Sequence, residues 1–323
     1  MHNLQNFNNN KSNITSNYIN NNNNNKVTTS KSKKNFYYNF IIGGTSETLS
    51  KTIIAPIERT KILLQSQQTL NSLNVKYKGT LDCILRVAKE QGVISFWRGN
   101  MANIYKYVPT FAFNYSIKEY LQSLLNCSKS NRKTIILNNI LSGFFAAGIT
   151  LFMTYPLDFT RTMIAVDLSK KGEANKYKGI KDCFSNYYKL EGIKGIYSGF
   201  ITAFIGISVY RGALFGFYDS FNYIFPKKDS VLFKYILSVI VSGLAGVVAL
   251  PFDTIRRRLI VQVGKIHKDY NGTLDCIRKI YKIEGIKGFN KGGYANFFRS
   301  FGSALTLILN DYLKILHKNL LYK

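Results

Sequence analysis

The sequence predicts an all-α membrane protein with six transmembrane helices in three pseudo-symmetric repeats of about 100 residues. Two observations carry this prediction. Three short motifs recur in the same order along the chain, and each repeat contains two apolar stretches of near-membrane length. The repeats are expected over residues 36–130, 131–229 and 230–323, behind an N-terminal tail at residues 1–35.

The tail and the overall charge limit the classes of protein that the chain can be. Residues 1–35 hold 14 Asn and no acidic residue, so this tract has too little apolar surface to fold and is predicted to be disordered. The whole chain has 44 Lys and Arg against 17 Asp and Glu, a net charge of +27. This excess suits an anionic substrate or an anionic lipid surface. The three His are far apart in the sequence, so no metal site is predicted. No set of a nucleophile and a base is visible that would indicate an enzyme.

Three motifs mark the repeats. In the first, a Tyr is followed by Gly two residues later and by Asp-Cys at the end; it covers residues 77–83, 177–183 and 270–276. The second contains a Pro, an acid two residues later and a base three residues after the acid, and begins at Pro56, Pro156 and Pro251. The third ends in Gly99, Gly199 and Gly292. Because three of the four Cys occupy one repeat position, we interpret them as repeat markers rather than as a disulfide or metal set.

One apolar stretch precedes each motif Pro, and another follows each third motif. Each has about 20 residues or more, which is the length needed to cross a hydrocarbon core of about 30 Å. In chain order they cover residues 36–55, 101–125, 137–155, 200–225, 232–250 and 294–320. The alternative interpretation is that these stretches are buried helices of a large soluble protein. Six stretches of this length in so short a chain make that interpretation the weaker one. Charges within the stretches, such as Glu47 and Lys51, are functional candidates because charge inside a membrane is costly.

The Pro motif predicts a gate. Pro kinks a helix, so three equivalent kinks would draw three helix ends together. The acid and the base lie on one helical face, and acids and bases of neighbouring repeats can therefore alternate around a ring. The predicted pairs are Glu58–Arg161, Asp158–Arg256 and Asp253–Lys61. Local pairing within each motif is the alternative, but the threefold recurrence behind a Pro favours the ring.

With these motifs the chain resembles the mitochondrial carrier family over residues 36 to about 320, and within it the group of ADP/ATP carriers. The likeness rests on residues 51–59, 90–100, 155–161 and 251–258. It implies a six-helix barrel that exchanges ADP and ATP across the mitochondrial inner membrane by alternating access. It also implies a monomer, both termini toward the intermembrane space, structural cardiolipin, and neither a metal nor another cofactor.

The resemblance also implies the site residues. Cations within the spans suit phosphate groups, and Tyr210 offers a ring on which a purine can stack. The implied substrate-binding residues are Lys51, Lys106, Asn114, Gly206, Ile207, Tyr210, Arg211 and Arg299. The implied matrix gate comprises the six paired residues above with Gln65 as a brace, and the signature is Arg256, Arg257 and Arg258. The implied cytoplasmic gate is formed by Glu119, Asp219, Asp311 and Lys314.

Several residues depart from the ADP/ATP carrier pattern. Lys106 stands in place of an Arg, Leu214 and Asn290 in place of aromatic residues, and residues 259–261 in place of three Met. Gln122 and Asn222 replace two bases of the cytoplasmic gate, which predicts easier opening on that side. These departures leave open a carrier for another anion, namely a deoxynucleotide, ATP-Mg/phosphate or coenzyme A. A basic nucleic-acid-binding protein is a weaker alternative because no nucleic-acid module is recognised.

Overall fold

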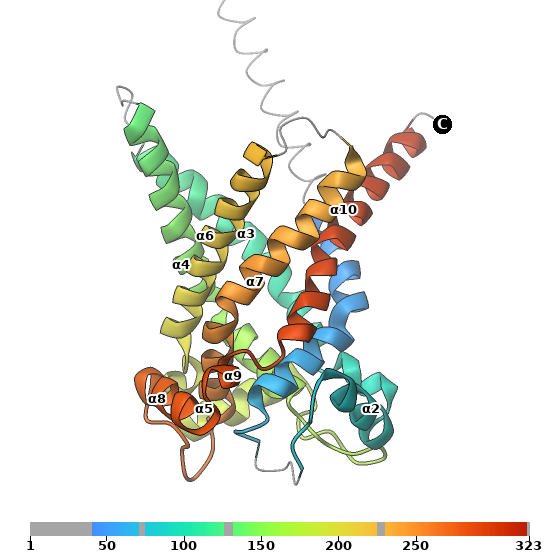
Figure 1. The fold of residues 1–323 in the computed structure, drawn as a ribbon, viewed down its shortest axis with the longest axis vertical. Helices are drawn as coiled ribbons and strands as arrows, with labels where there is room; N and C mark the ends of the chain where they lie inside the picture. Colours follow the sequence, from blue (N-terminus) through green and yellow to red (C-terminus); the bar gives the residue numbers. More distant parts are fainter. Residues whose placement is uncertain (1–40, 71–74, 126–131, 225–229, 322–323) are drawn as a thin grey trace, which may run out of the picture.

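The computed structural model describes residues 41–70, 75–125, 132–224 and 230–321, in which every regular element is helical. The predicted disordered tail at 1–35 lies outside these residues. Six long helices within them form the wall of a barrel (Figure 1). They are residues 41–66, α3 (Asn100–Leu125), α4 (Arg132–Ala165), α6 (Phe200–Ile224), α7 (Val231–Val261) and α10 (Gly293–Leu321).

The long helices follow the predicted spans, but three of them continue past the predicted end. The apolar stretches stop at the motif Pro, whereas the helices run on to residue 66, Ala165 and Val261. A Pro within a helix removes one backbone hydrogen bond and bends the helix without having to end it. Among the described helices, α6 and α7 are long and apolar enough to span a membrane by length and composition alone. Charged residues such as Lys106 in α3 and Arg299 in α10 interrupt the apolar character of others.

The long helices diverge at one end of the barrel and converge at the other, where the short helices lie (Figure 1). The described chain begins and ends at the divergent end. Along the wall, α3 packs on α4, and α7 packs on both α6 and α10. The short elements are α2 (Thr80–Gln91), the 3-10 helix η1 (Val93–Trp97), α5 (Ile180–Ile196), α8 (Thr273–Glu284) and α9 (Ile286–Phe289).

The first repeat motif builds the start of each short helix. In each repeat, the motif Asp accepts a hydrogen bond from the backbone N–H four residues earlier, at 2.8–2.9 Å. The Cys that follows is fully buried, and the three thiols are free. Burial raises the pKa of Cys83, Cys183 and Cys276 to about 12, so these thiols stay protonated at neutral pH. The motif therefore fixes the turn that leads into each of these helices and packs its first turn into the core.

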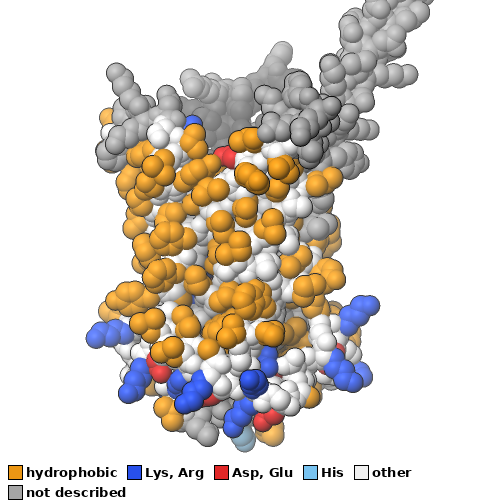
Figure 2. Space-filling view, turned by 90° about the vertical axis from the view of Figure 1, so that its right-hand side faces the viewer, with side chains coloured by type: hydrophobic (Ala, Val, Ile, Leu, Met, Phe, Trp, Pro, Cys, Tyr) orange, Lys and Arg blue, Asp and Glu red, His pale blue; other side chains and the backbone are white. Residues whose placement is uncertain are grey.

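The outer surface is apolar around the middle of the barrel. Figure 2 shows a belt of hydrophobic side chains on one face, with Lys and Arg gathered below it at the end where the short helices lie. Large apolar side chains are exposed on α4, α6, α7 and α10, among them Phe152, Ile201, Val248 and Phe301. An exposed apolar surface of this extent suits contact with lipid rather than with water.

Candidate functional site

A ring of ion pairs joins the three repeats where the long helices converge. Each pair links an acid of one repeat to a base of the next, as predicted: Glu58 with Arg161, Asp158 with Arg256 at 2.9 Å, and Asp253 with Lys61 at 2.7 Å. These pairs connect the first helix to α4, α4 to α7, and α7 back to the first helix. The prediction of pairing between neighbouring repeats is therefore confirmed, while its role as a gate stays a prediction.

The third repeat motif holds the ring together from outside. Its final Gly has a φ of +77 to +84°, a conformation that side chains rarely adopt. This Gly also lies against the helix that carries the ring base of the next repeat. A Cβ atom on it would lie 2.8, 3.1 and 3.4 Å from a backbone carbonyl oxygen, for Gly99 against Arg161, Gly199 against Arg256 and Gly292 against Lys61. The positive φ favours Gly at all three positions, and at Gly99 a side chain would also collide with the backbone of the neighbouring helix.

Two of the predicted substrate-binding cations contact the acids of the ring. Lys106 Nζ lies 2.6 Å from Asp158 Oδ1, and Lys51 Nζ lies 3.4 Å from Glu58 Oε1. Glu58 and Asp158 therefore each bind two cations, one within the ring and one from the predicted substrate-binding set. Both carboxylates are almost completely buried, so each depends on these cations for compensation of its charge.

The third acid is connected to the predicted substrate-binding set through an amide. Lys61 Nζ donates a hydrogen bond of 2.8 Å to Asn296 Oδ1, in addition to its ion pair with Asp253. Arg299 Nε donates to the same Asn296 oxygen at 3.3 Å. Among the described residues, Arg299 forms no ion pair with a carboxylate. Its guanidinium therefore retains donors for an anionic ligand.

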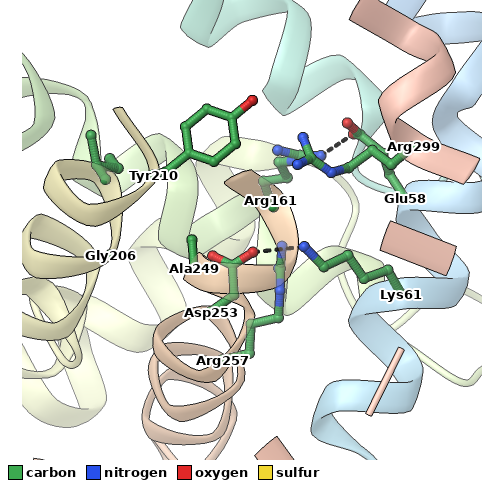
Figure 3. Close-up of a pocket in the computed structure, with 11 residues that line it drawn as sticks. Glu58, Lys61, Arg161, Gly206, Tyr210, Ala249, Asp253, Arg257 and Arg299 are labelled. Carbon is green, nitrogen blue, oxygen red and sulfur yellow. Dashed lines mark hydrogen bonds and ion pairs between the residues drawn. The ribbon is translucent and has the colours of Figure 1, made fainter. Parts of the chain in front are cut away.

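A cavity of about 200 Å³ lies against this ring (Figure 3). Four predicted substrate-binding residues line it, namely Gly206, Ile207, Tyr210 and Arg299, together with ring residues from all three repeats. The sequence reasoning did not assign Gly246 and Ala249 to the site, and it named Arg257 only as part of the signature; all three line the cavity. Because Gly246, Ala249 and Asp253 are spaced by three and four residues on α7, helical periodicity from Asp253 was the signal that would have found the first two.

The other predicted substrate-binding residues lie outside the lining of this cavity. Lys51 and Lys106 contact the ring acids as described above. Asn114 lies on α3, and Arg211 follows the cavity residue Tyr210 on α6. Arg211 is exposed and does not line the cavity. The substrate-binding role of all eight residues stays a prediction.

The three Arg of the signature and Gln65 lie in different environments. Arg256 belongs to the ring and Arg257 lines the cavity, whereas Arg258 is fully buried and its Nη2 lies 2.9 Å from Glu284 Oε2. Gln65 is also fully buried, and its Nε2 donates to the Thr254 hydroxyl at 3.2 Å. Its Oε1 has no hydrogen-bond partner within the described part of the chain. Gln65 follows Lys61 of the ring by four residues, or about one helical turn. Its predicted role as a brace of the gate stays a prediction.

The divergent end of the barrel is connected differently. Asp311 on α10 accepts a hydrogen bond of 2.8 Å from the Tyr235 hydroxyl on α7. Asp219, Asp311 and Lys314 are exposed, and these three form no ion pair with any residue whose side chain is described. The side chain of Glu119 lies outside the described part, so the predicted pair of Glu119 with Lys314 stays a prediction.

Comparison with known proteins agrees with this architecture. The family model "Mitochondrial carrier protein" matches residues 32–129, 133–229 and 227–320. The chain is 41% identical over 285 residues to ADP/ATP translocase 2 of Rattus norvegicus, covering 85% of this chain and 96% of the relative. It is 42% identical over 285 residues to ADP/ATP translocase 3 of Homo sapiens, with the same coverage. It is 41% identical over 283 residues to the human ADP/ATP translocase 4, covering 85% of this chain and 90% of the relative.

Proposed function

Because this chain belongs to the mitochondrial carrier family, we propose that it exchanges ADP for ATP across the mitochondrial inner membrane. Membership makes it a multi-pass mitochondrial membrane transporter and not an enzyme. The choice of nucleotide is supported by three relatives of at least 41% identity that are ADP/ATP translocases. The family matches begin and end near the proposed repeats at 36–130, 131–229 and 230–323.

The observation that carries the proposal is the sharing of ring acids between two kinds of cation. Lys51 and Lys106 bind Glu58 and Asp158 directly, so a phosphate group that attracts these lysines draws them away from the ring. Each acid then has one cation instead of two in a buried setting, and the ring pairs become weaker. Substrate binding thereby supplies the free energy that opens the barrel at the short-helix end.

The lining of the cavity suits the two parts of a nucleotide. Arg299 in the lining offers cationic donors for a diphosphate or triphosphate, and Arg can bind it through two parallel hydrogen bonds. Lys51 and Lys106, which lie outside the lining at the ring acids, offer further ones. The Tyr210 ring stands beside Gly206 and Ile207 on α6, where small and apolar surfaces leave room for a flat base. Residues 259–261, which replace three Met of the related group, are buried in the core away from this cavity. Their departure therefore does not favour a different substrate.

The proposal includes the placement in the membrane. Six crossings put the two ends of the chain on the same side, and we place both termini toward the intermembrane space. The divergent end of the barrel then opens to that side, and the basic short-helix end faces the matrix (Figure 2). We further propose that the protein works as a monomer in contact with cardiolipin, since basic surfaces on that side attract anionic lipid.

Uptake of labelled ADP into liposomes that contain the purified protein tests the proposal. We expect uptake into liposomes preloaded with ADP or ATP, and none into empty liposomes or those preloaded with phosphate. Exchange against phosphate, a deoxynucleotide or coenzyme A alone would identify a carrier of another anion.

The variant Arg299→Ala tests the site itself. We expect nucleotide uptake to be abolished, because the variant loses one of the two cavity cations, Arg257 and Arg299, that form no ion pair with a carboxylate among the described residues. Lys268→Ala is the matched control, since Lys268 forms an exposed ion pair with Glu191 outside the cavity. Undiminished uptake by Arg299→Ala would remove this residue from the site.

A further inference from the structure

An acidic side chain that the ring does not use lies above it in the first helix. Glu47 precedes Lys51 by four residues and Glu58 by eleven, so the three side chains share one face of the helix. Lys51 Nζ lies 3.6 Å from Glu47 Oε1 and 3.4 Å from Glu58 Oε1. The ammonium group is therefore held between two carboxylates. Glu58 belongs to the ring, and Glu47 lies about one turn beyond Lys51, and about three turns beyond Glu58, toward the divergent end.

A second helix fixes the other oxygen of this carboxylate. The Thr306 hydroxyl on α10 lies 3.2 Å from Glu47 Oε2 and 2.9 Å from the Gly302 carbonyl oxygen, so its one hydrogen is shared between the two acceptors. Thr306 follows Arg299 by seven residues, or about two turns, and so lies on the same face of α10. Glu47 is thus placed above the two cations Lys51 and Arg299, which come from different repeats. Its side chain retains about a quarter of its exposure, at 27%, so it can still interact with a ligand.

The acid at this position is specific to the first repeat. The equivalent residues, nine positions before the motif Pro in the second and third repeats, are Ala147 and Ser242. A carboxylate within a membrane-spanning helix is costly, and the ring does not need this one, because Glu58 already pairs with both Arg161 and Lys51. Packing does not account for it either, since Ala and Ser occupy the same place elsewhere in the barrel.

We propose that Glu47 determines specificity by competing with the nucleotide for Lys51, so that the site prefers ADP to ATP. This inference rests on the proposed nucleotide exchange. A phosphate group that binds Lys51 must displace one carboxylate and then remain close to the other, which repels it. ATP carries one more negative charge than ADP, so the repulsion weighs more heavily on ATP. Glu47 thus lowers the affinity for the nucleotide in two ways, by its ion pair with Lys51 and by the repulsion between its carboxylate and the phosphate groups. It does so without removing any hydrogen-bond donor from the cavity.

Neutral substitution of Glu47 tests the inference in reconstituted liposomes preloaded with ADP. The Michaelis constant is measured for external ADP and external ATP in turn. For Glu47→Gln we expect both constants to fall, that of ATP by several-fold more, so that the preference shifts toward ATP. Glu47→Ala is expected to give the same shift and serves if the Gln variant does not fold. Glu47→Asp keeps the charge and should retain the ordinary preference for ADP.

The matched control is Glu90→Gln, because Glu90 lies on α2 with a half-exposed side chain and, among the residues that the structure describes, forms an ion pair with Arg86 alone. Its preference should equal that of the unaltered protein. An unchanged ratio of the two constants in both neutral variants would overturn the inference, as would an equal fall for ADP and ATP. These results differ from a failure of the proposed function, in which the unaltered protein takes up neither nucleotide.

Discussion

The two ends of the barrel are built from the same three repeats, yet their charged residues are organised in opposite ways. At the short-helix end, three acids and three bases close a ring, and two of the acids bind a second cation. At the divergent end, the described acids Asp219 and Asp311 are exposed, and Asp311 accepts a hydrogen bond from Tyr235. The closed end thus holds all three acids in ion pairs, two of them buried, whereas Asp219 and Asp311 at the open end are exposed to water.

This difference shows why three similar repeats close the barrel at the short-helix end and leave the divergent end open. The helices converge where each motif Pro bends a long helix and where a Gly of positive φ packs on the helix of the next repeat. Burial makes the ring pairs interdependent, because removal of one partner leaves an uncompensated charge in a dry setting. Exposed acids at the other end cost little when unpaired, so that end can stay open without a penalty.

The largest effect is expected when the closed end is broken at its most buried acid. Asp158→Asn leaves both Lys106 and Arg256 without their carboxylate in a side-chain environment that is only 5% exposed. We expect a loss of about 3–5 kcal/mol in the free energy of unfolding, the range for breaking a buried pair, together with loss of exchange. Thermal unfolding of the purified protein and liposome uptake measure the two effects.

Asp269→Asn is the comparison variant for this prediction. Asp269 pairs with Lys265 within one turn of chain, and its side chain is 39% exposed. An exposed pair contributes about 0–1 kcal/mol, so the unfolding temperature should hardly move. Equal effects of the two variants would show that the ring is no more than a set of surface pairs.

A smaller effect is expected from the turn that supports the ring. Gly99→Ala forces a side chain into a backbone of φ +84° and places its Cβ 2.8 Å from the Arg161 carbonyl oxygen. We expect a destabilisation of about 1–3 kcal/mol, the cost of a strained backbone position, with the Arg161–Glu58 pair loosened. Gly79→Ala is the control, because Gly79 has extended backbone and open space around its Cβ position. If both variants unfold alike, the support by Gly99 is refuted.

The repeats and the ring could be predicted from the sequence because each depends on short-range spacing. The acid and base of each Pro motif are three residues apart, and threefold recurrence assigned their partners in the neighbouring repeat. The helix ends were harder, since the apolar stretches stop at Pro56, Pro156 and Pro251 while the helices continue for two to three further turns. Below the Pro, packing within the protein replaces contact with lipid, and the apolar pattern no longer marks the helix.

The second layer of contacts was not visible in the sequence. Lys106 meets Asp158, and Glu47 meets Thr306, across 52 and 259 residues, and neither pair belongs to a repeated motif. Asn296 was not singled out, although it bridges Lys61 and Arg299. Such contacts depend on how far α3 and α10 are rotated about their axes, and a pattern of residue types does not specify that rotation. Comparison of the three repeats predicts the contacts that all of them share, but it does not predict a contact that occurs in one repeat alone.

One substitution can give the divergent end an ion pair that the threefold pattern predicts but this chain lacks. In that pattern, position 222 of the second repeat corresponds to the base that would pair with Asp311 when this end closes. Asn222→Lys should therefore stabilise the closed form of the divergent end by up to about 1 kcal/mol, and slow exchange by up to about fivefold where reopening limits the rate. Exchange rates at low and high salt measure it, since screening should remove the effect. A slower rate that persists in high salt would argue against a new ion pair.

The smallest effect is expected from Tyr235→Phe, which removes only the hydroxyl that binds Asp311. A net hydrogen bond contributes about 0.5–1.5 kcal/mol, and the exposure of Asp311 places this one at the lower end. Because the bond joins α7 to α10 within one repeat in the open barrel, its loss should favour closure of the divergent end slightly. Combination with Asn222→Lys sharpens the comparison, since a released Asp311 is free to meet the new cation. The two changes should then couple in a double-mutant cycle, whereas strict additivity would mean that Tyr235 does not restrain Asp311 at all.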